Sequence, residues 1–297
     1  MITGFTIILE DDILYCSDDN RYNAFETLLF TEKLLRSINP KNTWRLKKIC
    51  LKDQRVGRER IIVKHIVTKK HQNLFFCIIG DFQVGSSETI KIVNDFSKQV
   101  NLHYKNLAEL KQASEEPVFN EIITLIVQFL KDKYSEPLEE EIIFDEVGNN
   151  VKNSIIYAGI STQGLPIISQ LFDISLLMNM TREKTNENLE LFTSDLSAKL
   201  ETISMNTQIR AKTRIKEIHL NDTEDLTRKL IIFFGNINGY SIDFIASGDF
   251  YRIKGIFKQF KAKMAQDNIF KEDFLGDLKP FKHLNQYLDE VIKEFDH

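Results

Sequence analysis

Two stretches of the chain carry the same residue pattern in the same order, about 165 residues apart. The run Ile78-Ile79-Gly80-Asp81-Phe82 precedes a segment with helical spacing of its apolar residues, and so does Ile245-Ala246-Ser247-Gly248-Asp249-Phe250. Glu116-Pro117-Val118-Phe119 and Lys279-Pro280-Phe281 each open a further helical segment at a similar offset. This offset is too long for a solenoid repeat and suits a tandem of whole domains. The sequence therefore predicts two copies of one small domain.

An acidic segment separates the two copies. Residues 113 to 150 hold 2 basic and 10 acidic side chains, whereas the rest of the chain is nearly balanced. Within this segment, Glu136-Pro137-Leu138-Glu139-Glu140-Glu141 combines a helix-breaking proline with like charges that resist compaction. We therefore predict a first domain over 1–135, a linker over 136–152 and a second domain over 153–297. Hydrophobic residues make up 42% of the chain, enough to bury two cores.

Periodicity and turn residues predict the order ββαβββαα in both copies. In the first copy we expect strands and helices near residues 4–9, 13–17, 23–38, 43–52, 60–69, 73–82, 87–101 and 117–133. In the second we expect them near 154–161, 166–171, 181–205, 214–220, 228–235, 240–247, 251–265 and 281–295.

This order, with its strand-turn-strand start and two closing helices, resembles the longin domain, a relative of the roadblock fold. The resemblance implies an α+β fold of two tandem longin-like units, each a five-stranded antiparallel sheet with the first helix on one face and the last two on the other. It also implies a docking protein, because tandem longin proteins bind and regulate small Ras-like GTPases on membranes. The implied partner is such a GTPase or another longin or roadblock protein. The second unit departs from the family in its unusually long first helix.

A search for chemical motifs finds almost none. The chain has no GxxxxGK[ST] loop, no GxGxxG after a strand, no HExxH and no CxxC, and its six histidines do not pair at metal-ligand spacing. We expect no catalytic residues, no metal and no cofactor, and read His65 and His219 as structural or surface residues. The two Gly-Asp-Phe runs are interpreted as strand-to-helix turns in which the aspartate caps the helix.

One hairpin is strongly basic. Eleven basic residues lie between Lys41 and Lys70, against only Asp53 and Glu59. We take Arg45, Lys47, Arg58 and Arg60 as candidates for binding an anionic surface, either lipid or an acidic protein face. An equally weighted reading is that these charges protect edge strands from aggregation. Nucleic acid is not expected, because Trp44 is the only aromatic residue among them.

The first helix has apolar residues on two sides. One arc can cover a sheet, while Phe30, Leu34 and Ile38, at i, i+4 and i+8, fall on the opposite side. We predict that these three residues contact a partner, and the resemblance points the same way. The alternative is that the second unit, or the segment Ile142-Ile143-Phe144, covers them within the chain.

These observations predict a non-catalytic scaffold or regulator, with a role in nucleotide exchange only as part of a complex. Three apolar cysteine positions, no signal-peptide pattern and no apolar run of about 18 residues favour a cytoplasmic location, with peripheral membrane contact left open. Dimerisation is also left open. The alternative is a small-molecule sensor built from tandem PAS- or GAF-like domains, which would need an enclosed polar pocket.

Overall fold

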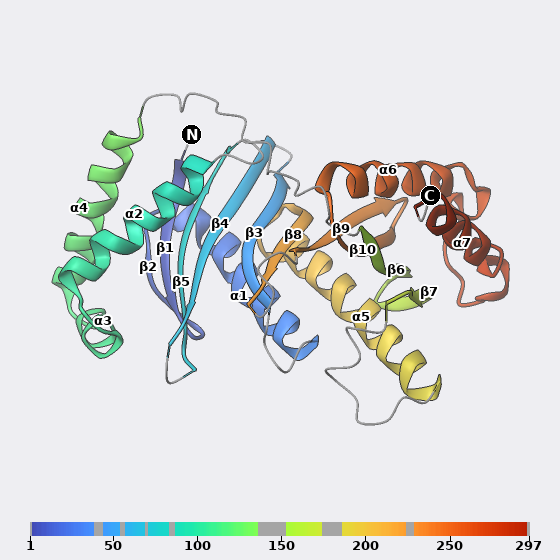
Figure 1. Ribbon diagram of the computed structural model, residues 1–297, viewed down its shortest axis with the longest axis horizontal. Coiled ribbons are helices and arrows are strands. Elements are labelled where there is room, and N and C mark those ends of the chain that lie inside the picture. The colour runs from blue at the N-terminus through green and yellow to red at the C-terminus, as the bar shows by residue number, and fades with distance from the viewer. Residues whose placement is uncertain are drawn as a thin grey trace. The chain divides into compact units, whose positions relative to one another are not determined.

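A computed structural model describes residues 2–38, 44–53, 57–68, 71–82, 87–135, 153–173, 186–223 and 229–295. The chain divides into two compact units, which are described separately (Figure 1). The first comprises Met1–Leu29 and Leu46–Glu146, and the second comprises Phe30–Arg45 and Val147–His297. The predicted linker, 136–152, lies outside the described residues.

The first unit pairs its first strand with its last. Its strands lie in the order β2-β1-β5-β4-β3, and each described pairing is antiparallel. The elements in chain order are β1 (Ile2–Leu9), β2 (Asp12–Cys16), a 3-10 turn (Asp19–Arg21), α1 (Tyr22–Ile38), β3 (Trp44–Asp53), β4 (Gly57–Val67), β5 (Asn73–Gly80), α2 (Ser87–His103), α3 (Leu107–Ala113) and α4 (Pro117–Lys133). Of these, the part of α1 from Phe30 on and the first two residues of β3 belong to the second unit. The sequence did not predict α3, which Asn106 caps by accepting a hydrogen bond from the Glu109 N–H at 3.0 Å.

The second unit has the same strand order when its strands are counted from its own start. Its order is β7-β6-β10-β9-β8, again antiparallel throughout. The elements are β6 (Ser154–Thr162), β7 (Leu165–Leu171), α5 (Asn186–Arg210), β8 (Arg214–Asp222), β9 (Lys229–Ile237), β10 (Tyr240–Ser247), α6 (Phe250–Gln266), two 3-10 turns (Asn268–Lys271 and Lys279–Phe281) and α7 (Leu284–Phe295).

In the first unit, one face of the sheet and helices α2, α3 and α4 enclose an apolar core. Alternate residues of β1, namely Phe5, Ile7 and Leu9, point into this core because successive side chains of a strand face opposite ways. Phe96 of α2 meets Phe5 and Phe76 edge to face, with ring centroids 5.1 and 5.7 Å apart.

In the second unit, α6 and α7 pack on one face of the sheet and α5 on the other (Figure 1). The α6–α7 side is filled by aromatic rings, with Phe244 4.9 Å from Phe260 and 5.3 Å from Phe257. The antiparallel α+β organisation expected from the sequence is confirmed. No described helix is long and apolar enough to cross a membrane.

Only the second Gly-Asp-Phe run caps a helix. Asp249 Oδ1 accepts a hydrogen bond from the Arg252 N–H at 2.7 Å, at the start of α6. Asn153 Oδ1 in turn accepts from the Asp249 N–H at 2.6 Å. In the first run the expectation was wrong for Asp81, because α2 begins only at Ser87.

Gly248 is the position in this turn that most restricts substitution. Its φ is +130°, and a Cβ there would lie 2.2 Å from Asn153 Oδ1 and 2.7 Å from Asn153 Cα. We predict that Gly248→Ala lowers the free energy of unfolding by about 1–3 kcal/mol, through backbone strain and displacement of Asn153. Urea denaturation measures this loss.

Gly255 provides the matched control. It lies inside α6, and a Cβ there meets nothing within 4 Å. Gly255→Ala should leave stability unchanged or raise it by up to about 1 kcal/mol. Equal losses for the two variants would contradict the assigned role of Gly248.

Candidate functional site

The predicted partner face on α1 is only partly exposed. Phe30 and Leu34 are half-buried, and Ile38 is buried with 7% of its surface exposed. All three residues belong to the second compact unit. The segment 142–144, which was the alternative cover, lies outside the described residues. Partner binding at this face stays a prediction. Phe30 and Leu34 are the two of these residues whose side chains are partly exposed.

The basic hairpin does not form one basic face. β3 and β4 pair with Lys52 opposite Arg58 and Cys50 opposite Arg60. Directly opposite residues share a face and alternate residues of a strand share a face. Arg58 and Arg60 therefore lie on one face of these strands, and Arg45 and Lys47 lie on the other.

The four basic residues also differ in exposure. Arg58 is exposed, Arg45 and Lys47 are half-buried, and Arg60 is buried at 7%. Sequence reasoning counted charges along the chain and did not apply the two-residue alternation of a strand to them. Binding of an anionic surface stays a prediction, and among the four it is Arg58 whose side chain is exposed.

His65 has a structural environment. Its Nε2 lies 2.9 Å from Asn73 Oδ1, and its ring lies 4.2 Å from that of Phe75. Both partners are on β5, so the histidine fixes the pairing of β4 with β5.

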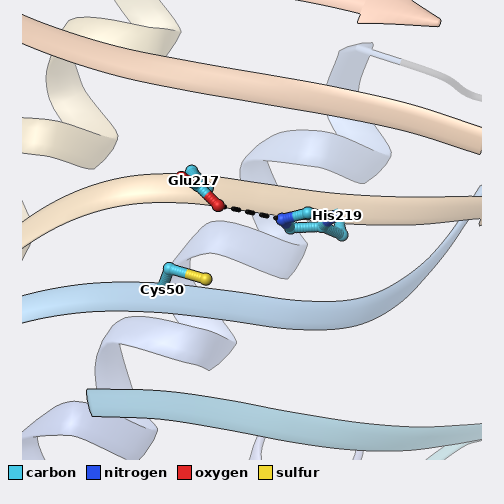
Figure 2. Close-up of side chains that lie close together, drawn as sticks. All are labelled: Cys50, Glu217 and His219. Carbon is cyan, nitrogen blue, oxygen red and sulfur yellow. Dashed lines mark hydrogen bonds and ion pairs between the residues drawn. The ribbon is translucent and has the colours of Figure 1, made fainter. Parts of the chain in front are cut away.

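His219 belongs to an ionic cluster of the second unit. Figure 2 shows its hydrogen bond to Glu217, which lies two residues earlier on the same face of β8. Glu217 Oε2 is 3.2 Å from His219 Nε2, and Glu217 Oε1 accepts from Lys254 Nζ at 2.6 Å. The ammonium of Lys254 also lies 4.7 Å from the centre of the Phe250 ring. Cys50, also labelled in Figure 2, lies on β3 of the first unit.

The cluster holds Glu217 in its charged form. Burial by itself would raise the pKa of this carboxyl, but the hydrogen bonds from His219 and Lys254 outweigh burial and lower the pKa to about 2. A carboxylate with so low a pKa is a weak base. Because Lys254 is on α6 and Glu217 is on β8, the arrangement ties the helix to the strand.

A second set of polar side chains lies between α5 and the sheet. The helix packs on β6, β7, β8 and β10. Ala158 and Ile160 of β6 point into the α6–α7 core, so Tyr157, Gly159 and Ser161 point to the α5 side. The side chains that meet there include five polar residues with at most 3% of their surface exposed: Tyr157, Ser161, Ser197, Glu201 and Asp243. We call them the polar layer.

Gly159 makes room for the tyrosine in this layer. The Tyr157 hydroxyl would lie 2.1 Å from a Cβ at Gly159, so only glycine lets the phenol lie along the strand. Gly159 is directly opposite Asp243 on β10, which places the hydroxyl beside this carboxyl. Ser197 of α5 is also close to the hydroxyl, but the two groups do not have hydrogen-bond geometry.

The surroundings of Asp243 in the polar layer are unfavourable for an ionised carboxyl. Burial, and then the nearby Glu201, raise the pKa of Asp243 well above its ordinary value. Burial likewise raises the pKa of Tyr157. The sequence analysis missed this layer, although an aspartate in the middle of the apolar run Tyr240–Ser247 was a signal for it.

Two described cavities lie in the first unit. One of about 650 Å³ lies beside α3, and one of about 410 Å³ lies between β2 and α4. Most of the α3 and α4 residues that line them are solvent-exposed, so both are surface grooves.

The ionic cluster predicts a pH dependence of stability. The pKa of Glu217 is lower in the folded state, so its contribution is present above about pH 4.5 and is lost as the pH falls through about 2. We predict that Glu217→Gln removes up to about 3 kcal/mol of the stability that wild type has at pH 6, and that the difference shrinks at pH 3. Denaturant titrations at both pH values test this. Glu272→Gln, at an exposed carboxylate, is the control, and an equal pH response in the two variants would contradict the cluster's role.

The chain matches no model of a known protein family, and it matches no curated protein.

Proposed function

We propose that this chain is a non-catalytic docking protein, built from two longin-like units, that binds a small Ras-like GTPase or a trafficking complex. The observation that carries the proposal is the repeated architecture. Both units have the element order ββαβββ followed by closing helices, and both place the first strand beside the last. In the second unit one helix covers one face and two cover the other, as the longin resemblance implies.

The filled cores support a platform over a small-molecule sensor. A sensor needs an enclosed pocket of several hundred Å³ with converging polar groups. Between the sheets and their paired helices, large side chains such as Phe76, Phe96, Phe244 and Phe260 are fully buried and in ring contact. Bulky side chains thus take up the space in which a PAS- or GAF-like domain would hold its ligand.

An exposed apolar stripe on α4 also favours docking. Val118, Leu125 and Phe129 are 54%, 65% and 53% exposed. At 100° per residue they lie within about 40° of one another, between the buried face of the helix and its polar side. Grouped apolar residues on a surface are typical of sites that bind another protein.

The proposal is tested by using the full chain as bait in its native host and identifying the proteins that co-purify. A Ras-like GTPase that also binds the purified chain directly would support the proposal. A stoichiometric bound metabolite and no protein partner would replace it with the sensor.

Two double variants then locate the docking face. Leu125→Ser with Phe129→Ser should change stability by no more than about 0.5 kcal/mol, because both side chains are exposed. Phe30→Ser with Leu34→Ser should cost more, about 1–2 kcal/mol, because both are half-buried. We predict that at least one of them binds the recovered GTPase tenfold or more weakly, measured by calorimetry alongside a melting curve.

Ile126→Ala serves as the control for folding. Ile126 is buried on the same helix as Leu125, and its truncation should cost about 2–5 kcal/mol. If both double variants melt as folded proteins and still bind the partner at wild-type strength, neither apolar face is the docking surface.

A further inference from the structure

We propose that the polar layer of the second unit is a binding site for a hard divalent cation, held by the carboxylates of Asp243 and Glu201 together with the hydroxyls of Tyr157, Ser161 and Ser197. The site is structural: it would fasten α5 to the sheet. It is independent of the docking function proposed above.

The donor atoms carry the proposal. Six buried side-chain oxygens of the layer have no hydrogen-bond partner in the protein: both of Asp243, Oε2 of Glu201, and the hydroxyls of Tyr157, Ser161 and Ser197. Leaving even one buried polar group unpaired destabilises a fold, so six in one place need a common explanation. Every one of them is oxygen. Carboxylate and hydroxyl oxygens without nitrogen or sulfur are the ligands of Ca²⁺ and Mg²⁺ rather than of zinc or copper.

The geometry converges from two elements. On the sheet, the Tyr157 hydroxyl lies over Gly159, which is opposite Asp243, and Ser161 follows two residues later on the same face. On α5, Ser197 and Glu201 are four residues apart and so project from the same side of the helix. Ser197 and Glu201 are both buried, and α5 packs on β6 and β10, the strands that carry the other four oxygens.

The charge balance also calls for a cation. The charged neighbour that acts on Asp243 from α5 is another carboxylate, Glu201. Its cross-strand partners are Gly159 on β6 and Phe234 on β9, which carry no charge. No described basic side chain is paired with either carboxylate. A divalent cation would neutralise the two carboxylates.

The expectation that the chain binds no metal rested on the spacing of its histidines and cysteines. A site of aspartate, glutamate, serine and tyrosine oxygens drawn from β6, α5 and β10 leaves no spacing motif. The proposal therefore replaces that expectation for structural cations and leaves it in place for catalytic zinc.

Terbium luminescence tests the proposal, because Tb³⁺ takes the place of Ca²⁺ and is sensitised by a tyrosine within a few ångströms. The full chain is refolded from urea with Tb³⁺, since the site is enclosed, and excess ion is removed. We expect stoichiometric sensitised emission that Ca²⁺ displaces. Ca²⁺ or Mg²⁺ at about 100 times its Kd should raise the Tm by about 5 °C.

Variants assign the signal to the layer. Asp243→Asn and Glu201→Gln should each abolish both the emission and the Tm shift, whereas Tyr157→Phe should lose most of the emission and keep a Tm shift. The control is Asp195→Asn, which removes an exposed carboxylate of α5 paired with Lys199 and should behave as wild type.

Three results would overturn the proposal. One is no Tm shift with any of the three ions after refolding. Another is an unchanged shift in Asp243→Asn. The third result applies if Asp243→Asn does not fold. Protons compete with Ca²⁺ for the carboxylates, so the Tm shift that Ca²⁺ gives wild type should then grow between pH 5 and 8. A Tm shift that stays the same over this pH range would refute the site. If wild type itself shows no ion response and Asp243→Asn is the more stable protein, Asp243 is instead held in its protonated form by burial.

Discussion

The pairing of the first strand with the last is the interaction on which each unit depends. β1 pairs with β5 over most of its length, and β6 pairs with β10 in the same way. These partners are about 70–90 residues apart, so forming the pair closes a long loop, and its entropy cost is recovered only when the intervening elements pack. Because both strands are then central, both of their faces need helices.

In the second unit, the two faces of the sheet meet this requirement differently. Toward α6 and α7 the strands present Ile242, Phe244 and Ala246, and aromatic contact fills the space. Toward α5, strand β10 presents Asp243, and the buried polar residues of the helix on this side are Ser197 and Glu201. An apolar face would avoid a loss of stability, because buried polar groups destabilise a fold unless every one of them has a hydrogen-bond partner. The polar layer is therefore the part of the fold that most needs a functional explanation.

The proposed activities use different parts of the molecule. Docking relies on apolar side chains left exposed, such as Leu125 and Phe129 on α4. Cation binding relies on oxygens that are fully enclosed in the second unit. An enclosed cation would make α5 rigid without changing its outer surface, so loss of the cation should affect folding before it affects partner binding.

The sequence by itself determined the order of the strands and of the helices other than α3, and the cap at Asp249, because these follow from local periodicity and turn chemistry. The antiparallel α+β class was expected only from the longin resemblance. The sequence analysis missed α3, although Asn106 followed by Glu109 is a helix-start pattern. Only the tertiary structure decided how charges and apolar residues are exposed. It divided the basic hairpin between two faces, buried Ile38, and brought Tyr157, Ser197 and Asp243 together from three elements. Contacts between residues 40 to 90 positions apart depend on strand register and helix packing, which no local pattern encodes.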